Sequence, residues 1–212
     1  MTFKIHKGII ILILMSIIAT AFIYSSLPEK IPSHWNIRGE IDSYNNKSFV
    51  WFTSLLPLGI YLLMIYIPEI DSRRESYKKH KKAYKILMNI LVLFFIVIHW
   101  ITIFSALGHQ IRVARIIPIG VGILFIVIGN YMGQIRPNYT FGIKIPWTLA
   151  DETVWRKTHR VGSFAFILSG LIFIIAGIIN RSYSFVLAMS SIFITLIYTF
   201  VYSYLEYKKI HG

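Results

Sequence analysis

Six long apolar segments constrain the fold of this chain more than any other feature of its 212 residues. A helix needs about 20 apolar residues to cross the hydrocarbon core of a bilayer. The segments cover residues 8–27, 49–67, 86–107, 116–132, 161–179 and 185–205, of which the fourth is the shortest. The mean hydropathy of +0.63 is too high for a water-soluble domain. The sequence therefore predicts an all-α polytopic membrane protein, a bundle of six transmembrane helices.

The first segment begins like a signal peptide. Lys4 and Lys7 precede it, and residues 19–21 form the small-residue pattern of a cleavage site. The apolar run nevertheless continues to a full membrane length. We therefore expect an uncleaved first helix.

Positive charges are distributed unevenly over the segments that connect these helices. Of the 22 Lys and Arg residues, 16 fall on one side of the predicted membrane and six on the other. The positive-inside rule then predicts that both termini are cytoplasmic. Residues 28–48 become an outer loop, and residues 68–85 and 133–160 become inner loops. We treat the chain as one domain with two three-helix halves, residues 1–107 and residues 108–212.

The sequence contains no recognisable catalytic or metal-binding constellation. Cysteine is absent, which excludes disulfides and cysteine-based metal sites. HExxH and GxSxG motifs are missing, as are paired intramembrane aspartates. His34, Glu40 and Asp42 lie close together in the outer loop, but no paired-histidine spacing accompanies them. We predict no enzymatic activity, no metal and no cofactor.

A run of basic residues follows the second apolar segment. Its members are Arg73, Arg74, Lys78, Lys79, Lys81, Lys82 and Lys85. Juxtamembrane charge of this kind orients a membrane protein and attracts anionic lipid. The same field can steer an acidic surface of a cytoplasmic partner. Because the membrane accounts for the basic run, we predict contact with lipid and no direct binding of nucleic acid.

Polar side chains inside the apolar segments are the intramembrane candidates. His99 lies near the middle of the third segment, where an ionisable residue is costly and often functional. A neutral, hydrogen-bonded core histidine is the alternative. Ser191, Thr195, Tyr198 and Tyr202 share one face of the sixth segment, which we expect to point inward. This face could partner His99 or bond to a neighbouring helix.

Small residues predict close helix packing in the second half of the chain. Gly122, Gly129 and Gly133 share a face of the fourth segment, and Gly162, Ser169 and Ala176 repeat every seven residues on the fifth. Asn130, beside Gly129, is expected to form a local hydrogen bond that ties the second inner loop to the bundle.

The second inner loop has a turn-rich first part and a helix start in its second part. Thr148 and Asp151 have the spacing of a capping box, and Glu152 and Arg156 are placed for an ion pair one helical turn apart. Trp147 and Trp155 could anchor in the lipid interface. These features predict an interfacial helix that leads into the fifth span.

Two motifs resemble the SdpI family of bacterial membrane proteins. The inner loop carries Gly129, Asn130, Asn138, Gly142, Ile143, Pro146, Trp147, Thr148, Leu149, Glu152, Val154 and Trp155 in the family's GN, N, GI, PWTL and ExVW pattern. The outer loop carries Leu27, Pro28, Ile31, Pro32, His34, Trp35, Asn36, Gly39 and Asp42 as LPxxIPxHWNxxGxxD. Together the motifs extend the resemblance over most of the chain. Lys144 stands where the family commonly has arginine, which argues against a bidentate contact there.

The resemblance implies a multi-pass immunity protein of the bacterial cell membrane. Such a protein protects a cell against a secreted, membrane-active peptide toxin, and its toxin-engaged form captures a winged-helix transcriptional repressor. The toxin-binding candidates are Pro32, His34, Trp35, Asn36, Gly39 and Asp42. The partner-binding candidates are Arg73, Arg74, Lys78, Lys79, Pro146, Trp147, Thr148, Glu152 and Trp155. The alternative is a small transporter or proton-linked carrier, for which His99 and the polar face of the sixth segment would form the pathway. The intramembrane polar candidates are His99, Asn130 and Tyr198.

Overall fold

The computed structural model describes residues 6–181 and 183–212. Within these residues, six helices are long and apolar enough to cross a membrane, which confirms the predicted helical bundle. They are α1 (Lys7–Ile23, continued by the 3-10 turn η1, Tyr24–Ser26), α2 (Phe49–Ile70), α4 (Lys81–Ala106), α5 (Val113–Met132), α7 (Glu152–Ile179) and α8 (Ser184–His211). Two short helices, α3 (Ser76–Lys79) and α6 (Pro146–Ala150), lie in the connections between them.

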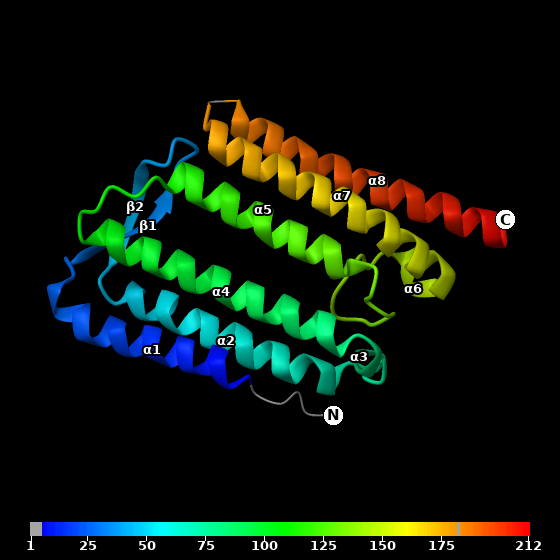
Figure 1. Cartoon of the computed structure of the whole chain (residues 1–212), viewed down its shortest axis with the longest axis horizontal. Coiled ribbons are helices and arrows are strands. Elements are labelled where there is room, and N and C mark those ends of the chain that lie inside the picture. Colours follow the sequence, from blue (N-terminus) through cyan, green and yellow to red (C-terminus); the bar gives the residue numbers. More distant parts are fainter. Residues whose placement is uncertain (1–5, 182) are drawn as a thin grey trace.

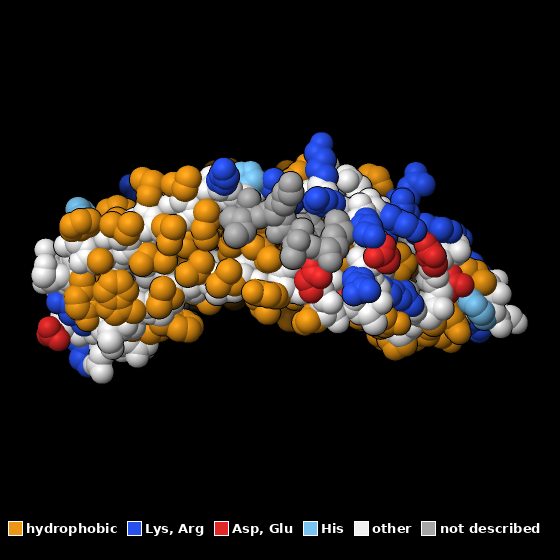
Figure 2. Space-filling model, turned by 90° about the horizontal axis from the view of Figure 1, so that it is seen from below, with side chains coloured by type: hydrophobic (Ala, Val, Ile, Leu, Met, Phe, Trp, Pro, Cys, Tyr) orange, Lys and Arg blue, Asp and Glu red, His pale blue; other side chains and the backbone are white. Residues whose placement is uncertain are grey.

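The helices lie roughly parallel to one another and form two packed groups (Figure 1). Helices α1, α2 and α4 form one group, α5, α7 and α8 form the other, and α4 contacts α5 between them. We call the end that carries α3, α6 and the C-terminus the basic end, and the opposite end the hairpin end. Lys and Arg side chains gather towards the basic end, whereas apolar side chains cover much of the remaining length (Figure 2).

Side-chain burial explains why this bundle needs lipid around it. Ile13, Tyr61, Met88 and Val92 are almost completely buried between α1, α2 and α4. Large apolar side chains nevertheless remain on the outer surface, where Phe22 is 81% exposed. Covering this apolar surface with lipid hydrocarbon is favourable, whereas exposing it to water is not.

Helices α4, α7 and α8 extend beyond the predicted apolar segments at the basic end. Helix α7 begins at Glu152 and α8 ends at His211, so both add polar turns to an apolar span. The apolar segments mark only the part of a helix that lipid can surround. The polar turns beyond it are stabilised by protein contacts, such as the ion pair of 2.7 Å between Lys157 Nζ and Glu206 Oε2.

Small residues allow α5 and α7 to pack closely, but the predicted GxxxG pair of Gly129 and Gly133 does not form the contact. A Cβ atom added to Gly122 would lie 2.5 Å from the Gly170 carbonyl oxygen, and one on Gly129 would lie 2.7 Å from that of Ser163. Ser163 Oγ donates to the Gly129 carbonyl at 2.7 Å. Gly133 meets nothing within 4 Å, so its place in the predicted interface is wrong. The contact repeats every seven residues, because that spacing returns to the same helix face.

The polar face of α8 packs against α7. Ser169 Oγ lies 2.8 Å from Thr195 Oγ1 and donates to the Ser191 carbonyl at 3.2 Å. Tyr198 is 50% exposed, so its predicted inward position is wrong. The buried face continues instead through Thr199 and Ser203, whose short side chains fit between closely packed helices.

The predicted outer loop contains a β-hairpin, which the sequence analysis did not predict. Strands β1 (Lys30–Trp35) and β2 (Ile41–Asn46) pair antiparallel, with Ile31 opposite Asn45 and Trp35 opposite Ile41. Ile31 is fully buried and packs in an apolar cluster with Leu27, Val50 and Ile103. This contact fixes the base of the hairpin to α2 and α4.

Candidate functional site

The hairpin turn is built by two residues of the outer motif. Asn36 Oδ1 accepts hydrogen bonds from the backbone N–H groups of Arg38 and Glu40, and Asn36 Nδ2 donates to Glu40 Oε2. Gly39 has a φ of +79°, in the left-handed region that favours glycine. A Cβ atom there would lie 2.8 Å from the backbone nitrogen of Ala114 on α5. The turn therefore docks tightly on the second group of helices.

A groove of about 790 Å³ lies beneath this hairpin and between the helices of the second group. We call it the hairpin groove. Five of the six predicted toxin-binding residues line it, namely His34, Trp35, Asn36, Gly39 and Asp42. Its helical walls come from α4, α5, α7 and α8 and include Ile101, Ile117, Val121, Phe125, Phe173 and Met189. Pro32 is buried at the base of β1 instead.

The hairpin groove combines apolar walls with a polar rim. His34 Nδ1 and Asp42 Oδ1 are 2.6 Å apart on adjacent strands, and their side chains are 67% and 43% exposed. Arg181, in the turn between α7 and α8, lines the same groove. Such a site suits an amphipathic ligand, because apolar surface can leave water along the helices while polar groups bind at the rim.

His99 belongs to a separate polar cluster in the first group of helices. Its side chain is almost fully buried, with Nε2 2.8 Å from Thr20 Oγ1 and Nδ1 3.0 Å from Thr53 Oγ1. The structure therefore places it as a hydrogen-bonded core histidine between α1, α2 and α4. Of the alternatives for the polar face of the sixth segment, hydrogen bonding to a neighbouring helix is confirmed and pairing with His99 is not, because Ser169 of α7 contacts Ser191 and Thr195.

At the basic end, Asp71 joins the two inner loops. Its carboxylate accepts hydrogen bonds from Arg73 N at 2.8 Å, Tyr77 Oη at 2.9 Å, Tyr139 N at 3.0 Å and Thr140 Oγ1 at 2.7 Å. Burial raises the pKa of this carboxyl, but the four hydrogen bonds outweigh burial and hold the pKa below its ordinary value. Asp71 is therefore a charged hub.

His80 makes a second link between the inner loops. Its Nδ1 atom accepts from Arg136 N at 3.1 Å, and its ring packs in an aromatic cluster with Tyr77 and Phe141. Burial lowers the pKa of His80 to about 4, and the charge of Arg136 acts in the same direction. The ring is therefore neutral near pH 7. We call this region around Asp71, His80 and Asn138 the loop junction.

Two polar residues of the second inner loop, Asn138 and Lys144, bind mainly to the backbone of the same loop. Asn138 is fully buried, and its Oδ1 atom accepts from Thr140 N and Phe141 N. Lys144 Nζ donates to the carbonyls of Tyr139 and Thr140, at 3.2 and 2.6 Å. A tetrahedral ammonium serves two separate carbonyls well, without the planar fork of arginine. Asn130 is exposed, and its side chain makes no hydrogen bond within residues 6–181 and 183–212, so the structure does not support its predicted role as a tie to the bundle.

The PWTL segment forms α6, and its capping differs from the prediction. Thr148 is the third residue of α6, where its hydroxyl accepts from Ile145 N and donates to the Ile143 carbonyl. Asp151 begins the next helix, because its Oδ1 atom accepts from Thr153 N and Val154 N. The predicted single capping box is thus two separate caps. The predicted pair of Glu152 and Arg156 is confirmed at 3.8 Å on the surface.

Trp155 is a core residue, so its predicted position in the lipid interface is wrong. It is fully buried, its Nε1 atom donates to the Ile135 carbonyl at 2.9 Å, and its ring stacks on His159 at 4.1 Å. His159 in turn accepts from Ile143 N at 3.0 Å. Trp147 is half-buried against Phe200 and Tyr204 of α8. The tryptophans therefore hold the loop to α7 and α8.

The structure divides the predicted partner-binding residues into accessible and inaccessible ones. Arg74, Lys78, Lys79, Pro146 and Glu152 are exposed, whereas Thr148 and Trp155 are buried. The residues that the sequence reading missed are Asp71, Tyr77 and His80. No local pattern marks them, because Asp71 and His80 bind partners, and Tyr77 packs on the Phe141 ring, about 55 to 70 positions further along the chain.

These features define a class: a six-span helical protein of the membrane, with an amphipathic groove at one end and a rigid polar loop junction at the other. Residues 134–203 match the SdpI/YfhL protein family, and residues 11–58 match a domain of unknown function (DUF1648). The Immunity protein SdpI of Bacillus subtilis (strain 168) is 28% identical over 203 residues, which cover 96% of each chain. No solved structure matches.

The predicted resemblance to the SdpI family is therefore confirmed, and the chain is a multi-pass protein of the bacterial cell membrane.

Proposed function

We propose that this protein is a non-enzymatic immunity protein that protects its cell against a secreted, membrane-active peptide toxin by binding the peptide in the hairpin groove. The observation that carries the proposal is the groove itself, which joins the outer motif to apolar walls of α5, α7 and α8. A membrane-active peptide suits a site with apolar walls and a polar rim, because one face of such a peptide is apolar and the other is polar. The similarity to Immunity protein SdpI supports immunity as the role.

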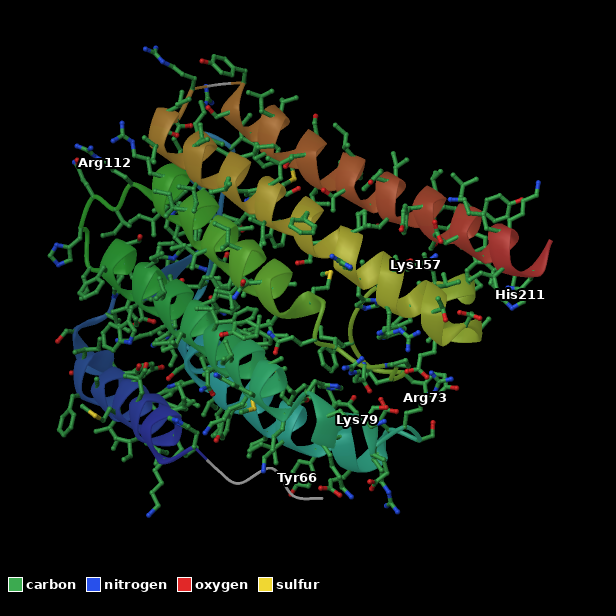
Figure 3. All side chains as sticks on the ribbon, turned by 45° about the vertical axis from the view of Figure 1, so that its right-hand side comes forward. Tyr66, Arg73, Lys79, Arg112, Lys157 and His211 are labelled. Atoms are coloured by element: carbon green, nitrogen blue, oxygen red, sulfur yellow. The ribbon has the colours of Figure 1, made fainter. Side chains whose placement is uncertain are left out.

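The proposal places the hairpin end outside the cell and the basic end in the cytoplasm. Arg73, Lys79 and His211 lie at one end of the molecule and Arg112 lies at the other (Figure 3). The chain has no cysteine, so single substitutions can report this orientation. We expect Ser43→Cys to react with a membrane-impermeant maleimide in intact cells and Ser72→Cys to react only after lysis. The reverse pattern would contradict the orientation.

Toxin protection can be tested by narrowing the groove without changing its polar rim. Ile117 lines the groove on α5, whereas its neighbour Ile116 is 39% exposed on the outer surface. We expect Ile117→Trp to lower the survival of a sensitive host under toxin and Ile116→Trp to leave survival unchanged, at equal amounts of inserted protein. Full protection by Ile117→Trp would refute binding in the groove.

We further propose that the basic end captures a cytoplasmic transcriptional repressor when toxin is bound. Arg74 and Lys78 are exposed on the first inner loop and Pro146 is exposed on the second, and α7 begins at this end with Glu152 and extends to the wall of the hairpin groove. A toxin can drive capture only if it binds two states of the helices with different affinity. A fluorescent repressor should move to the membrane on toxin addition. Unchanged localisation of the repressor would contradict capture and would leave the proposed immunity role standing alone.

A further inference from the structure

A second pocket, of about 450 Å³, opens at the basic end beside the loop junction. We call it the basic pocket. It is lined by Arg73, Ser76, Lys79, Arg136, Pro137, Leu149, Ala150 and Glu152. These residues come from the first inner loop, from the second inner loop and from the start of α7. A ligand in the pocket would therefore contact both halves of the chain at once.

The basic pocket carries an excess of positive charge. Arg73, Lys79 and Arg136 contribute three cations, and Glu152 contributes one carboxylate whose ion-pair partner is Arg156. Within residues 6–181 and 183–212, the three cations form no ion pair with a carboxylate. Glu75 pairs with Lys78 instead, and Glu206 pairs with Lys157 and Lys209. The pocket therefore has cationic donors available for an anion.

Buried side chains of the loop junction fix the backbone of the two arginines. Arg73 N donates to Asp71 Oδ1 at 2.8 Å, and the Arg73 guanidinium lies over the Tyr139 ring at 4.7 Å. Arg136 N donates to His80 Nδ1, and the Arg136 carbonyl accepts from Asn138 Nδ2 at 2.9 Å. Fixing the backbone before binding reduces the entropy that a ligand must overcome.

We propose that the basic pocket binds a phosphate group, carried either by an anionic phospholipid headgroup or by free phosphate. Two planar guanidinium groups and one ammonium match the oxygens of a phosphate, which arginine can bind in a bidentate way. This site differs from diffuse attraction of the basic run to a membrane surface, because it depends on residues of the second inner loop as well as the first. The proposal is independent of toxin protection.

The test uses the full-length protein in nanodiscs. In phosphatidylcholine discs, thermal unfolding is followed with added inorganic phosphate against chloride at the same ionic strength. In discs with one-fifth phosphatidylglycerol, native mass spectrometry counts the retained anionic lipids. The test variant is Arg73→Gln with Arg136→Gln. The control is Lys82→Gln with Arg160→Gln, which removes the same number of charges from exposed positions of the basic end outside the pocket.

We expect the pocket variant to weaken phosphate or phosphatidylglycerol binding at least about tenfold, as the loss of charge-assisted hydrogen bonds implies, and the control to change it less than about twofold. Stabilisation by inorganic phosphate would identify a soluble ligand, and retention of phosphatidylglycerol alone would identify a lipid. Equal effects of the two variants would overturn the proposal in favour of diffuse charge. Binding of polyglutamate without binding of phosphate or lipid would overturn it in favour of an acidic protein surface.

Discussion

Replacement of Gly39 by alanine should undock the hairpin turn from α5. The φ of +79° costs a residue with a Cβ atom about 1–2 kcal/mol. The added atom would also lie 2.8 Å from Ala114 N and 2.9 Å from Ala114 Cβ, and overpacking of this kind costs about 1–3 kcal/mol. The docked state should therefore lose about 2–5 kcal/mol, a shift of roughly 30-fold or more.

The effect should be local, because the base of the hairpin is anchored elsewhere by Ile31. Amides near the turn, including that of Gly39, which donates to the Asn36 carbonyl at 2.8 Å, should exchange with deuterium faster. Survival of a sensitive host under toxin should fall, while the amount of inserted protein stays the same. Hydrogen exchange measured in nanodiscs and a survival assay test the two consequences.

Gly108→Ala provides a matched control. Gly108 has a φ of +85° in the connection between α4 and α5, but a Cβ atom there would meet nothing within 4 Å. It therefore adds a similar backbone strain without a clash. If Gly39→Ala and Gly108→Ala give the same turn exchange and the same protection, close contact of the turn with Ala114 is not needed and the reasoning is refuted.

Three further changes test the packing and the loop junction. Gly122→Ala should lower the free energy of unfolding by about 1–3 kcal/mol, because its Cβ atom would lie 2.5 Å from the Gly170 carbonyl oxygen. Gly133→Ala is the control, because a Cβ atom there meets nothing within 4 Å, and equal thermal shifts of the two variants would contradict the observed interface. Asp71→Asn should lower the free energy of unfolding by about 1–3 kcal/mol, because an amide nitrogen cannot accept the hydrogen bonds that the carboxylate oxygen accepts. An unchanged midpoint of thermal unfolding would show that Asp71 does not stabilise the junction of the two loops. The pKa of His80 falls from 6.5 to about 4 on folding, so below pH 6.5 the unfolded state binds the extra proton and stability should decrease towards pH 4, by on the order of 2–3 kcal/mol. His80→Gln should flatten this pH dependence, and an unchanged slope would assign it to other groups.

The fold class depends on composition along the chain, so the sequence alone was sufficient to predict it. Each transmembrane helix needs a long apolar segment, and such a segment is visible without knowledge of its neighbours. The contiguous motifs around His34 and Pro146 were sufficient to indicate the SdpI family for the same reason. The groove residues His34, Trp35 and Asp42 were also found from the sequence, because they fall within one short motif.

The helix-facing details could be predicted only in part. A shared helix face correctly indicated that Gly122 and Gly129 pack against another helix, but the same argument could not show that Gly133 and Tyr198 lie outside the helix contacts. One helical face spans several residues, and the partner helix decides which of them it covers. Trp155 illustrates the same limit, since a tryptophan beside a membrane span can anchor in lipid or fill a core.

The sequence by itself determined the six spans, the uneven charge distribution and the family resemblance, because each is a property of neighbouring residues. Only the tertiary structure decided that the hairpin turn docks on α5, that Asp71 meets Thr140 and that Arg73 and Arg136 line one pocket. These contacts join positions about 60 to 75 residues apart. Helix packing brings such positions together, and no local pattern encodes which distant partner each side chain will meet.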